Sequence, residues 1–391
     1  MKKLTAAALA VLLVCSLGAV GVSAQGSGGV VPAASADLIN EDGAVKASTG
    51  DAPSGGSLSF DVAPNQTLYL RLGPADSGAG RSVALIEDES GESYVENNVT
   101  PKELANLDLF RLKSDKDGAG KGLVKVSQYN EKSIGGSGRS AWLKIDIGES
   151  QTDEELKARL DLTFTARRDQ ETDDGDFLWK KGDYALLRLT FYINNDLQKG
   201  DDVDADPGDE FVYDPVSNEK NMVTWDRVAT LAFTADDDAS KFYAKLSTKA
   251  NPVIYETYGD PAGAELFFRD FTGSPAISAT SRAVLTLLYP WPEEDDGAPV
   301  PEKCRIYSKN VDGELTDVSS LFSYVEEDED GNEVNGWRTK IRTLGCYIIS
   351  DKELDTSRRP QTEPETPAQT WQAPPAVDVN KNTKVNPPTG K

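Results

Sequence analysis

Histidine is absent from all 391 residues of the chain. This absence excludes Ser-His-Asp and Cys-His catalytic arrangements, histidine-ligated zinc and histidine general bases, because each of them needs an imidazole ring. The chain has only three cysteines, and it contains no CxxC pair, nucleophile elbow, SxxK motif or glycine-rich phosphate loop. Any catalysis would therefore depend on carboxylates, lysine, tyrosine or Ser-Lys pairs.

Long apolar runs are also scarce, and the one at the N-terminus has the pattern of an export signal. Two lysines precede an apolar stretch centred on residues 7–14, and the small residues Val-Ser-Ala at 22–24 fit a cleavage site. Residues 1–24 are therefore predicted to be a secretory signal peptide. The mature chain is expected to begin near Gln25, and no membrane span is expected in it.

Basic residues are few compared with acidic ones. Removing the two lysines of the signal lowers the basic count from 41 to 39 against 65 acids, so the net charge falls from −24 to −26. A chain of this charge repels nucleic acid and anionic lipid, so neither is an expected partner. The acidity is expected to form a solvated surface.

The chain after the signal predicts a first β domain. Residues 25–56 are rich in Gly, Ala and Ser and are predicted to be a flexible leader. From Ser57 onward, runs such as LSFDV and LYLRL alternate apolar and polar residues, which is typical of half-buried strands. We therefore predict an antiparallel, immunoglobulin-like β-sandwich over residues 57–197. Capping patterns predict two short helices, beginning at Thr100 and Thr152.

A second β domain is predicted further along the chain. Residues 198–219 are polar, Asp-rich and interrupted by two prolines, so they are predicted to be an acidic linker. Strand-like runs follow over residues 220–354, including ATLAF at 229–233 and PVIYETY at 252–258. These runs predict a second immunoglobulin-like β-sandwich, so the expected fold class is all-β.

The C-terminal residues 355–391 contain several prolines, many Thr and Gln and one large aromatic residue. They are predicted to be a disordered stalk, because such a segment buries too little apolar surface to offset the entropy of ordering. The stalk ends in a distinctive pentapeptide: Asn386, Pro387, Pro388, Thr389 and Gly390.

Two segments resemble parts of exported Gram-positive proteins. NPPTG resembles an NPxTG variant of the motif that sortases cleave between Thr and Gly to attach a protein to peptidoglycan. Only Lys391 follows, without the usual apolar span and basic tail, so wall anchoring and free secretion both stay open. CRIYSKNVDGELTDVSSLF and TLGCYIIS resemble the closing strands of β-sandwich modules in clostridial-type surface proteins. That resemblance covers at most residues 220–354 and implies a fold and a location but no activity.

Two cysteines remain after removal of the signal, Cys304 and Cys346. An even pair in an exported protein is compatible with a disulfide. Each cysteine also alternates with an isoleucine, Ile306 or Ile348, which is compatible with two small hydrophobic residues on inward strand faces. Both interpretations stay open.

Four aspartates of the predicted linker are candidates for a calcium site: Asp202, Asp204, Asp206 and Asp209. Their spacing begins like an EF-hand loop, but Pro207 stands where the loop needs Gly, and Tyr213 stands where it needs a bidentate acid. A calcium site of another type and a solvated acidic linker both stay open. No other cofactor is expected.

Tryptophans are candidates for sugar binding, because ring faces stack on pyranose rings. The candidates are Trp142, Trp179, Trp225, Trp291 and Trp337. Trp291, in the loop-like YPWPEED, is the predicted glycan contact, whereas Trp142 and Trp225 lie in alternating runs and are expected in the core.

The sequence thus predicts an exported, non-catalytic protein of the bacterial cell surface or the medium, with a structural or binding function. One alternative is an adhesin that binds carbohydrate or host matrix. Another is a polysaccharide hydrolase with two carboxylates about 5 to 10 Å apart. Pairing of edge strands into a filament also stays open.

Overall fold

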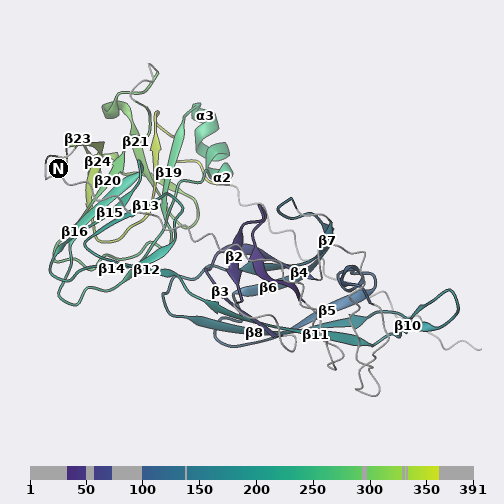
Figure 1. Ribbon diagram of the computed structural model, residues 1–391. Coiled ribbons are helices and arrows are strands. Elements are labelled where there is room, and N and C mark those ends of the chain that lie inside the picture. Colours follow the sequence, from purple (N-terminus) through teal and green to yellow (C-terminus); the bar gives the residue numbers. More distant parts are fainter. Residues whose placement is uncertain are drawn as a thin grey trace, which may run out of the picture. The chain divides into compact units, whose positions relative to one another are not determined.

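The computed structural model describes residues 33–49, 57–72, 99–136, 139–292, 297–327, 331 and 333–360 (Figure 1). It is predominantly β, with mainly antiparallel pairing, so the predicted all-β class is confirmed. The chain divides into two compact units, Met1–Asp196 and Leu197–Lys391. The predicted signal peptide and the NPPTG pentapeptide lie outside the described residues.

Unit 1 contains two larger sheets whose inward residues share one hydrophobic core. The five-stranded sheet has the order β2-β1-β4-β7-β6, with β1 (Ala33–Ile39), β2 (Val45–Ser48), β4 (Gln66–Leu72), β6 (Val124–Lys132) and β7 (Ser140–Ile147). The four-stranded sheet has the order β3-β11-β8-β5, with β3 (Ser57–Val62), β5 (Phe110–Asp117), β8 (Leu156–Ala166) and β11 (Tyr184–Ile193). The architecture is therefore sandwich-like.

Alternation along the strands builds this core. On β8, Leu160, Leu162 and Phe164 are fully buried, whereas Arg159 and Asp161 are exposed. Side chains of successive strand residues point to opposite faces, so one face packs and the other meets water. Two strands beyond β8 form a separate ribbon: β9 (Gln170–Glu171) and β10 (Phe177–Trp179).

Two expectations for unit 1 are wrong. The predicted leader 25–56 contains β1 and β2, because Leu38 is buried in the core and pairs with Leu70 of β4. The second predicted helix is absent: Thr152 Oγ1 accepts a hydrogen bond from Glu154 N at 3.0 Å, but the alternating residues that follow extend into β8. The first predicted helix is confirmed as α1 (Pro101–Leu104), which has the full capping box.

The described residues of unit 2 form three sheets. The six-stranded sheet has the order β13-β15-β16-β20-β24-β23, with β13 (Asp202–Ala205), β15 (Lys220–Trp225), β16 (Ala229–Thr234), β20 (Ala283–Leu288), β23 (Ser323–Glu327) and β24 (Glu333–Ile341). The five-stranded sheet has the order β18-β19-β25-β21-β22, with β18 (Leu246–Ser247), β19 (Leu266–Phe271), β21 (Arg305–Lys309), β22 (Leu315–Asp317) and β25 (Cys346–Ser350). The smallest contains β12 (Asp196–Lys199), β14 (Phe211–Asp214) and β17 (Phe242–Ala244).

The predicted acidic linker 198–219 belongs to unit 2. It contributes β13 and β14, and Phe211 and Tyr213 are buried in the unit 2 core. The Tyr213 hydroxyl lies 2.7 Å from Gly200 O and 2.9 Å from Asn221 Oδ1, and its one proton is shared between these two acceptors. The acids of these strands occupy outward positions, which is why the composition of the segment resembles that of a linker.

The run 252–258, expected as a strand, is helical. It forms α2 (Pro252–Ile254), the π-helical turn η1 (Tyr255–Gly259) and α3 (Asp260–Ala262), which pack on β19 (Figure 1). Asn251 caps the start through its side chain, and Gly263 ends the helix at φ 58. These caps outweigh the strand propensity of the run. Two 3-10 turns complete the unit, η2 (Pro301–Lys303) and η3 (Ser319–Leu321).

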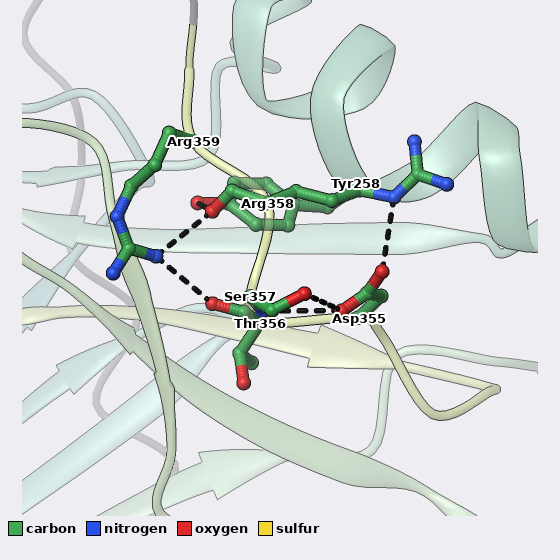
Figure 2. A network of polar contacts seen from close by, with 6 residues as sticks. All are labelled: Tyr258, Asp355, Thr356, Ser357, Arg358 and Arg359. Atoms are coloured by element: carbon green, nitrogen blue, oxygen red, sulfur yellow. Dashed lines mark hydrogen bonds and ion pairs between the residues drawn. The ribbon is translucent and has the colours of Figure 1, made fainter.

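The first residues of the predicted stalk are packed against unit 2 (Figure 2). Leu354 N donates to the Tyr307 hydroxyl at 2.7 Å, and the Tyr258 hydroxyl donates to Arg358 O at 3.2 Å. Arg359 pairs with Glu314 at 2.6 Å. Residues 355–360 therefore belong to the folded unit, and the rest of the predicted stalk lies outside the described residues. In the described part of the chain, no helix has the length and apolar character that a membrane crossing needs.

Candidate functional site

A groove of about 660 Å³ lies at one end of the four-stranded sheet of unit 1. Three cationic residues line it, Arg111, Arg167 and Lys181. The remaining lining residues are Thr163, Thr165, Ala166, Gly182 and Tyr184. We call this hollow the basic groove.

The floor of the basic groove is one row of residues across three strands. Arg111 of β5 pairs with Thr165 of β8, and Thr165 pairs with Tyr184 of β11. Their neighbours Phe110 and Ala166 are buried in the core, so alternation turns Arg111 and Thr165 to the outer face. Thr165 and Tyr184 are half-buried, whereas Arg111 is exposed.

A hairpin connects β8 to β11, and its stem, residues 166–167 and 181–183, forms one wall of the groove. Ala166 N donates to Asp183 O at 2.8 Å, and Gly182 N donates back to Ala166 O at 3.0 Å. Arg167 N donates to Leu109 O at 2.8 Å, which holds it beside β5. Gly182 has φ 100, a conformation that residues with a Cβ rarely adopt. These bonds bring Arg167 and Lys181 to the same end of the sheet.

The hairpin that carries the stem packs against the hydrophobic core of unit 1. The buried Trp179 ring packs on Phe110, with ring centroids 5.4 Å apart. Two nearby carboxylates accept hydrogen bonds from backbone amides: Asp183 from Lys180 N at 2.8 Å, and Asp169 from Lys181 N at 2.7 Å. These two carboxylates therefore stabilise the backbone of the stem.

The electrostatics of the basic groove oppose those of the whole chain, whose net charge is −24. No carboxylate is among the lining residues, and the side chains of Arg111, Arg167 and Lys181 form no ion pair with any described residue. Elsewhere on the same face, Arg188 lies 3.2 Å from Asp161. The groove can therefore hold an anion, since its cations have no internal partner to displace.

A smaller groove of about 210 Å³ lies on the outer face of the six-stranded sheet of unit 2. Met222, Ala232 and Val284 give it an apolar centre, and Arg338 lies at its side. Arg338 Nη2 already donates to Glu327 O at 3.0 Å. This groove, like the basic groove, has no carboxylate in its lining.

The four candidate calcium ligands are not brought together. Asp202 and Asp204 are exposed along β13, whereas Asp206 lies beyond its end. Asp209 Oδ2 accepts a hydrogen bond from Asp206 N at 2.9 Å, so this carboxylate closes a turn. No group of three or more acidic or cysteine side chains suited to a metal ion occurs among the described residues. The structure therefore does not support the calcium prediction.

Cys304 and Cys346 are buried free thiols, so the disulfide interpretation is wrong. In the antiparallel pair β21–β25, Arg305 lies opposite Ser350, and Lys309 lies opposite Cys346. Cys304 precedes Arg305, so at about 3.3 Å per residue the two cysteines are roughly 13 Å or more apart along the strands, whereas a disulfide needs Cα atoms within about 7 Å. Burial is the main reason that the pKa of Cys304 rises to about 11 and that of Cys346 to about 12.

Trp291 is buried rather than presented to solvent, with 6% of its surface exposed. Phe267 and Tyr289 lie against its ring, with centroids at 4.8 and 5.1 Å, and its Nε1 donates to Glu265 at 2.8 Å. The predicted glycan contact therefore has no free ring face. Trp142 and Trp225 are buried, as predicted.

Sequence reasoning did not single out the lining of the basic groove. Arg111 occupies an ordinary outward position on β5, and Arg167 and Lys181 lie in the hairpin stem. Only the pairing of β5 with β8 and the hydrogen bonds of the stem bring the three residues to one groove. The one signal that could have pointed to them is that basic residues, which are scarce in this chain, recur near the ends of adjacent predicted strands. The chain matches no family model, and no curated protein is significantly similar to it.

Proposed function

We propose that this chain is an exported bacterial protein of the cell surface or the medium, which displays two immunoglobulin-like β-sandwich modules and acts by binding rather than by catalysis. The observation that carries the proposal is the pairing of a signal-peptide pattern at residues 1–24 with the NPPTG pentapeptide at 386–390. The absence of histidine and the lack of carboxylates in both groove linings favour binding over catalysis.

Expression of the full chain in a Gram-positive host tests export. The expected product lacks the first 24 residues, which N-terminal sequencing of the mature protein detects. Recovery only after digestion of the wall with a muramidase would indicate attachment to peptidoglycan, whereas recovery from the medium would indicate release. A product that keeps Met1 and stays in the cytoplasm would contradict the proposal.

The second candidate function is that of an adhesin for carbohydrate or host matrix. The basic groove favours it, because its open hollow offers hydroxyl groups and cations on a rigid sheet. A glycan array probed with the full chain, with and without calcium, tests this function. Absence of binding to any glycan or matrix protein would leave display alone as the proposed role.

A further inference from the structure

The basic groove holds an unbalanced cluster of cations in an acidic chain. Burial of the neighbouring Phe110, Ala166 and Trp179 fixes the backbone around the cluster, so the three cationic residues start from fixed positions at the groove. Like charges placed close together repel, and a bound anion removes that repulsion. No carboxylate lines the groove itself, so an anionic ligand is the partner that its lining can accept.

We propose that the basic groove binds an acidic polysaccharide, with Arg111, Arg167 and Lys181 holding the carboxylate or sulfate groups of the sugar chain. This inference rests on the proposed binding function and names its ligand class. Arg side chains bind planar oxyanions through two parallel hydrogen bonds, and Lys adds a point charge. The two arginines come from β5 and from the hairpin stem, so they approach the groove from different elements.

The neutral part of the lining suits the uncharged part of a sugar. Thr163 and Thr165 place hydroxyl groups on the floor, where they donate to or accept from sugar hydroxyls. Tyr184, half-buried in the same row, adds a phenol and an aromatic ring. A lining that combines three cations with hydroxyl groups matches a ligand that carries charge and many hydroxyl groups.

Charge density favours a sugar chain over a nucleic acid. Duplex DNA carries one charge per about 1.7 Å of its axis, so a long stretch would bring many more charges against a chain of net charge −24. An acidic polysaccharide carries at most a few charges per sugar unit and presents hydroxyls between them. Three cations in one groove of a chain with net charge −24 suit the second pattern.

Binding of the full chain to immobilised polymers tests the proposal. The polymers are polygalacturonate, which carries carboxylates, dextran sulfate, neutral dextran and single-stranded DNA. We expect binding to at least one acidic polysaccharide, none to dextran and weaker binding to DNA. The carboxylate and sulfate arms identify which group is preferred. Raising the salt concentration should weaken binding, because the charged groups are open to solvent.

Matched variants locate the site. The triple variant Arg111→Gln, Arg167→Gln and Lys181→Gln should weaken binding about tenfold or more, because charged hydrogen bonds are lost. The control variant Lys157→Gln, Arg159→Gln and Arg188→Gln removes the same charge further along the same face and should stay within about twofold of the unchanged chain. Circular dichroism and urea unfolding check that both variants fold.

Each other outcome overturns the inference. Equal losses in the two triple variants would mean that binding follows net charge rather than the groove. Binding to DNA as tight as to the polysaccharides would exclude selectivity for sugar. If neither acidic polymer binds, the ligand class is wrong, whereas export and binding to a neutral glycan on the array would still support the proposed function.

Discussion

Arg269 of β19 donates from its Nε to the carbonyl oxygen of Val228, 3.3 Å away, and so links the five-stranded sheet of unit 2 to the turn between β15 and β16. Its Nη1 donates to Phe268 O at 2.9 Å. Arg269 is only 4% exposed, and burial lowers its pKa to about 10. The charge is thus held by carbonyl groups, and Arg269 pairs with no carboxylate among the described residues, so desolvation is the main cost of burying this charge.

Replacement of Arg269 should separate the role of its bulk from that of its charge. Arg269→Met should change the free energy of unfolding by less than about 1 kcal/mol, because Leu288 N still donates to Val228 O at 3.0 Å. Arg269→Ala should lower it by about 2 to 4 kcal/mol, because it leaves a cavity between the sheets. Urea unfolding measures both. Equal losses would show that the hydrogen bonds matter more than the packing.

Cys304 and Cys346 should resist alkylation in the folded protein. The thiolate is the reactive form, and the raised pKa values of about 11 and about 12 leave almost none of it at pH 8. Iodoacetamide followed by peptide mass spectrometry should label neither cysteine in buffer and both in urea. A peptide pair joined by a disulfide in the oxidised native protein would contradict the strand register.

Asp146 should stabilise unit 1 over a defined pH range. Burial raises its pKa, but hydrogen bonds from Lys144 and Thr67 outweigh burial and lower the pKa below 3.8. The pKa of Lys144 rises above 10.5, chiefly through its hydrogen bond to Asp146. Lys144 Nζ and Asp146 Oδ1 are 2.9 Å apart. Stability from Asp146 is therefore present above about pH 4 and lost as pH falls through its lowered pKa.

The variant Asp146→Asn tests this range. At pH 7 we expect a loss of about 0.5 to 1 kcal/mol, a small value because both side chains are one-third exposed, at 33% each. The loss should shrink towards pH 3 and should be nearly constant between pH 5 and 9. Lys113→Gln, which breaks a well-exposed pair with Asp115, is the matched control and should cost less. A loss that grows on acidification would reverse the sign argued above.

Tyr307→Phe should weaken the attachment of the segment that begins at Leu354. The fully buried Tyr307 hydroxyl accepts the Leu354 amide at 2.7 Å, and its removal leaves a buried N–H without a partner. The expected cost is about 1 to 2 kcal/mol. The Tyr192 hydroxyl accepts a hydrogen bond from the exposed Lys157 at 3.2 Å, so Tyr192→Phe should lower the free energy of unfolding by less than about 0.5 kcal/mol. Equal costs in urea unfolding would mean that the segment is not held through Tyr307.

Sequence reasoning succeeded where one face of a strand is buried. The alternation of β8 and β11 is complete enough that the buried residues could be named before the structure, and Trp225 was expected in the core for the same reason. The capping box at Thr100 was equally local, because its hydrogen bonds join residues three apart. Local patterns of this kind need no knowledge of distant partners.

Predictions from composition were wrong for acidic or small-residue segments in which only a few apolar residues pack in a core. Leu38 in the predicted leader and Phe211 and Tyr213 in the predicted linker each bury a side chain in a core built by other strands. The run beginning at Pro252 was misassigned because Asn251 and Gly263 cap a helix, whereas its β-branched and aromatic residues favour a strand.

The sequence by itself determined the strand-rich character of the chain, its acidity and its lack of imidazole, because these follow from composition and from the two-residue period of extended backbone. The tertiary structure alone decided that Arg111, Thr165 and Tyr184 form one row and that Cys304 and Cys346 lie apart. Register between strands depends on how distant apolar faces pack together, and no single strand carries that information.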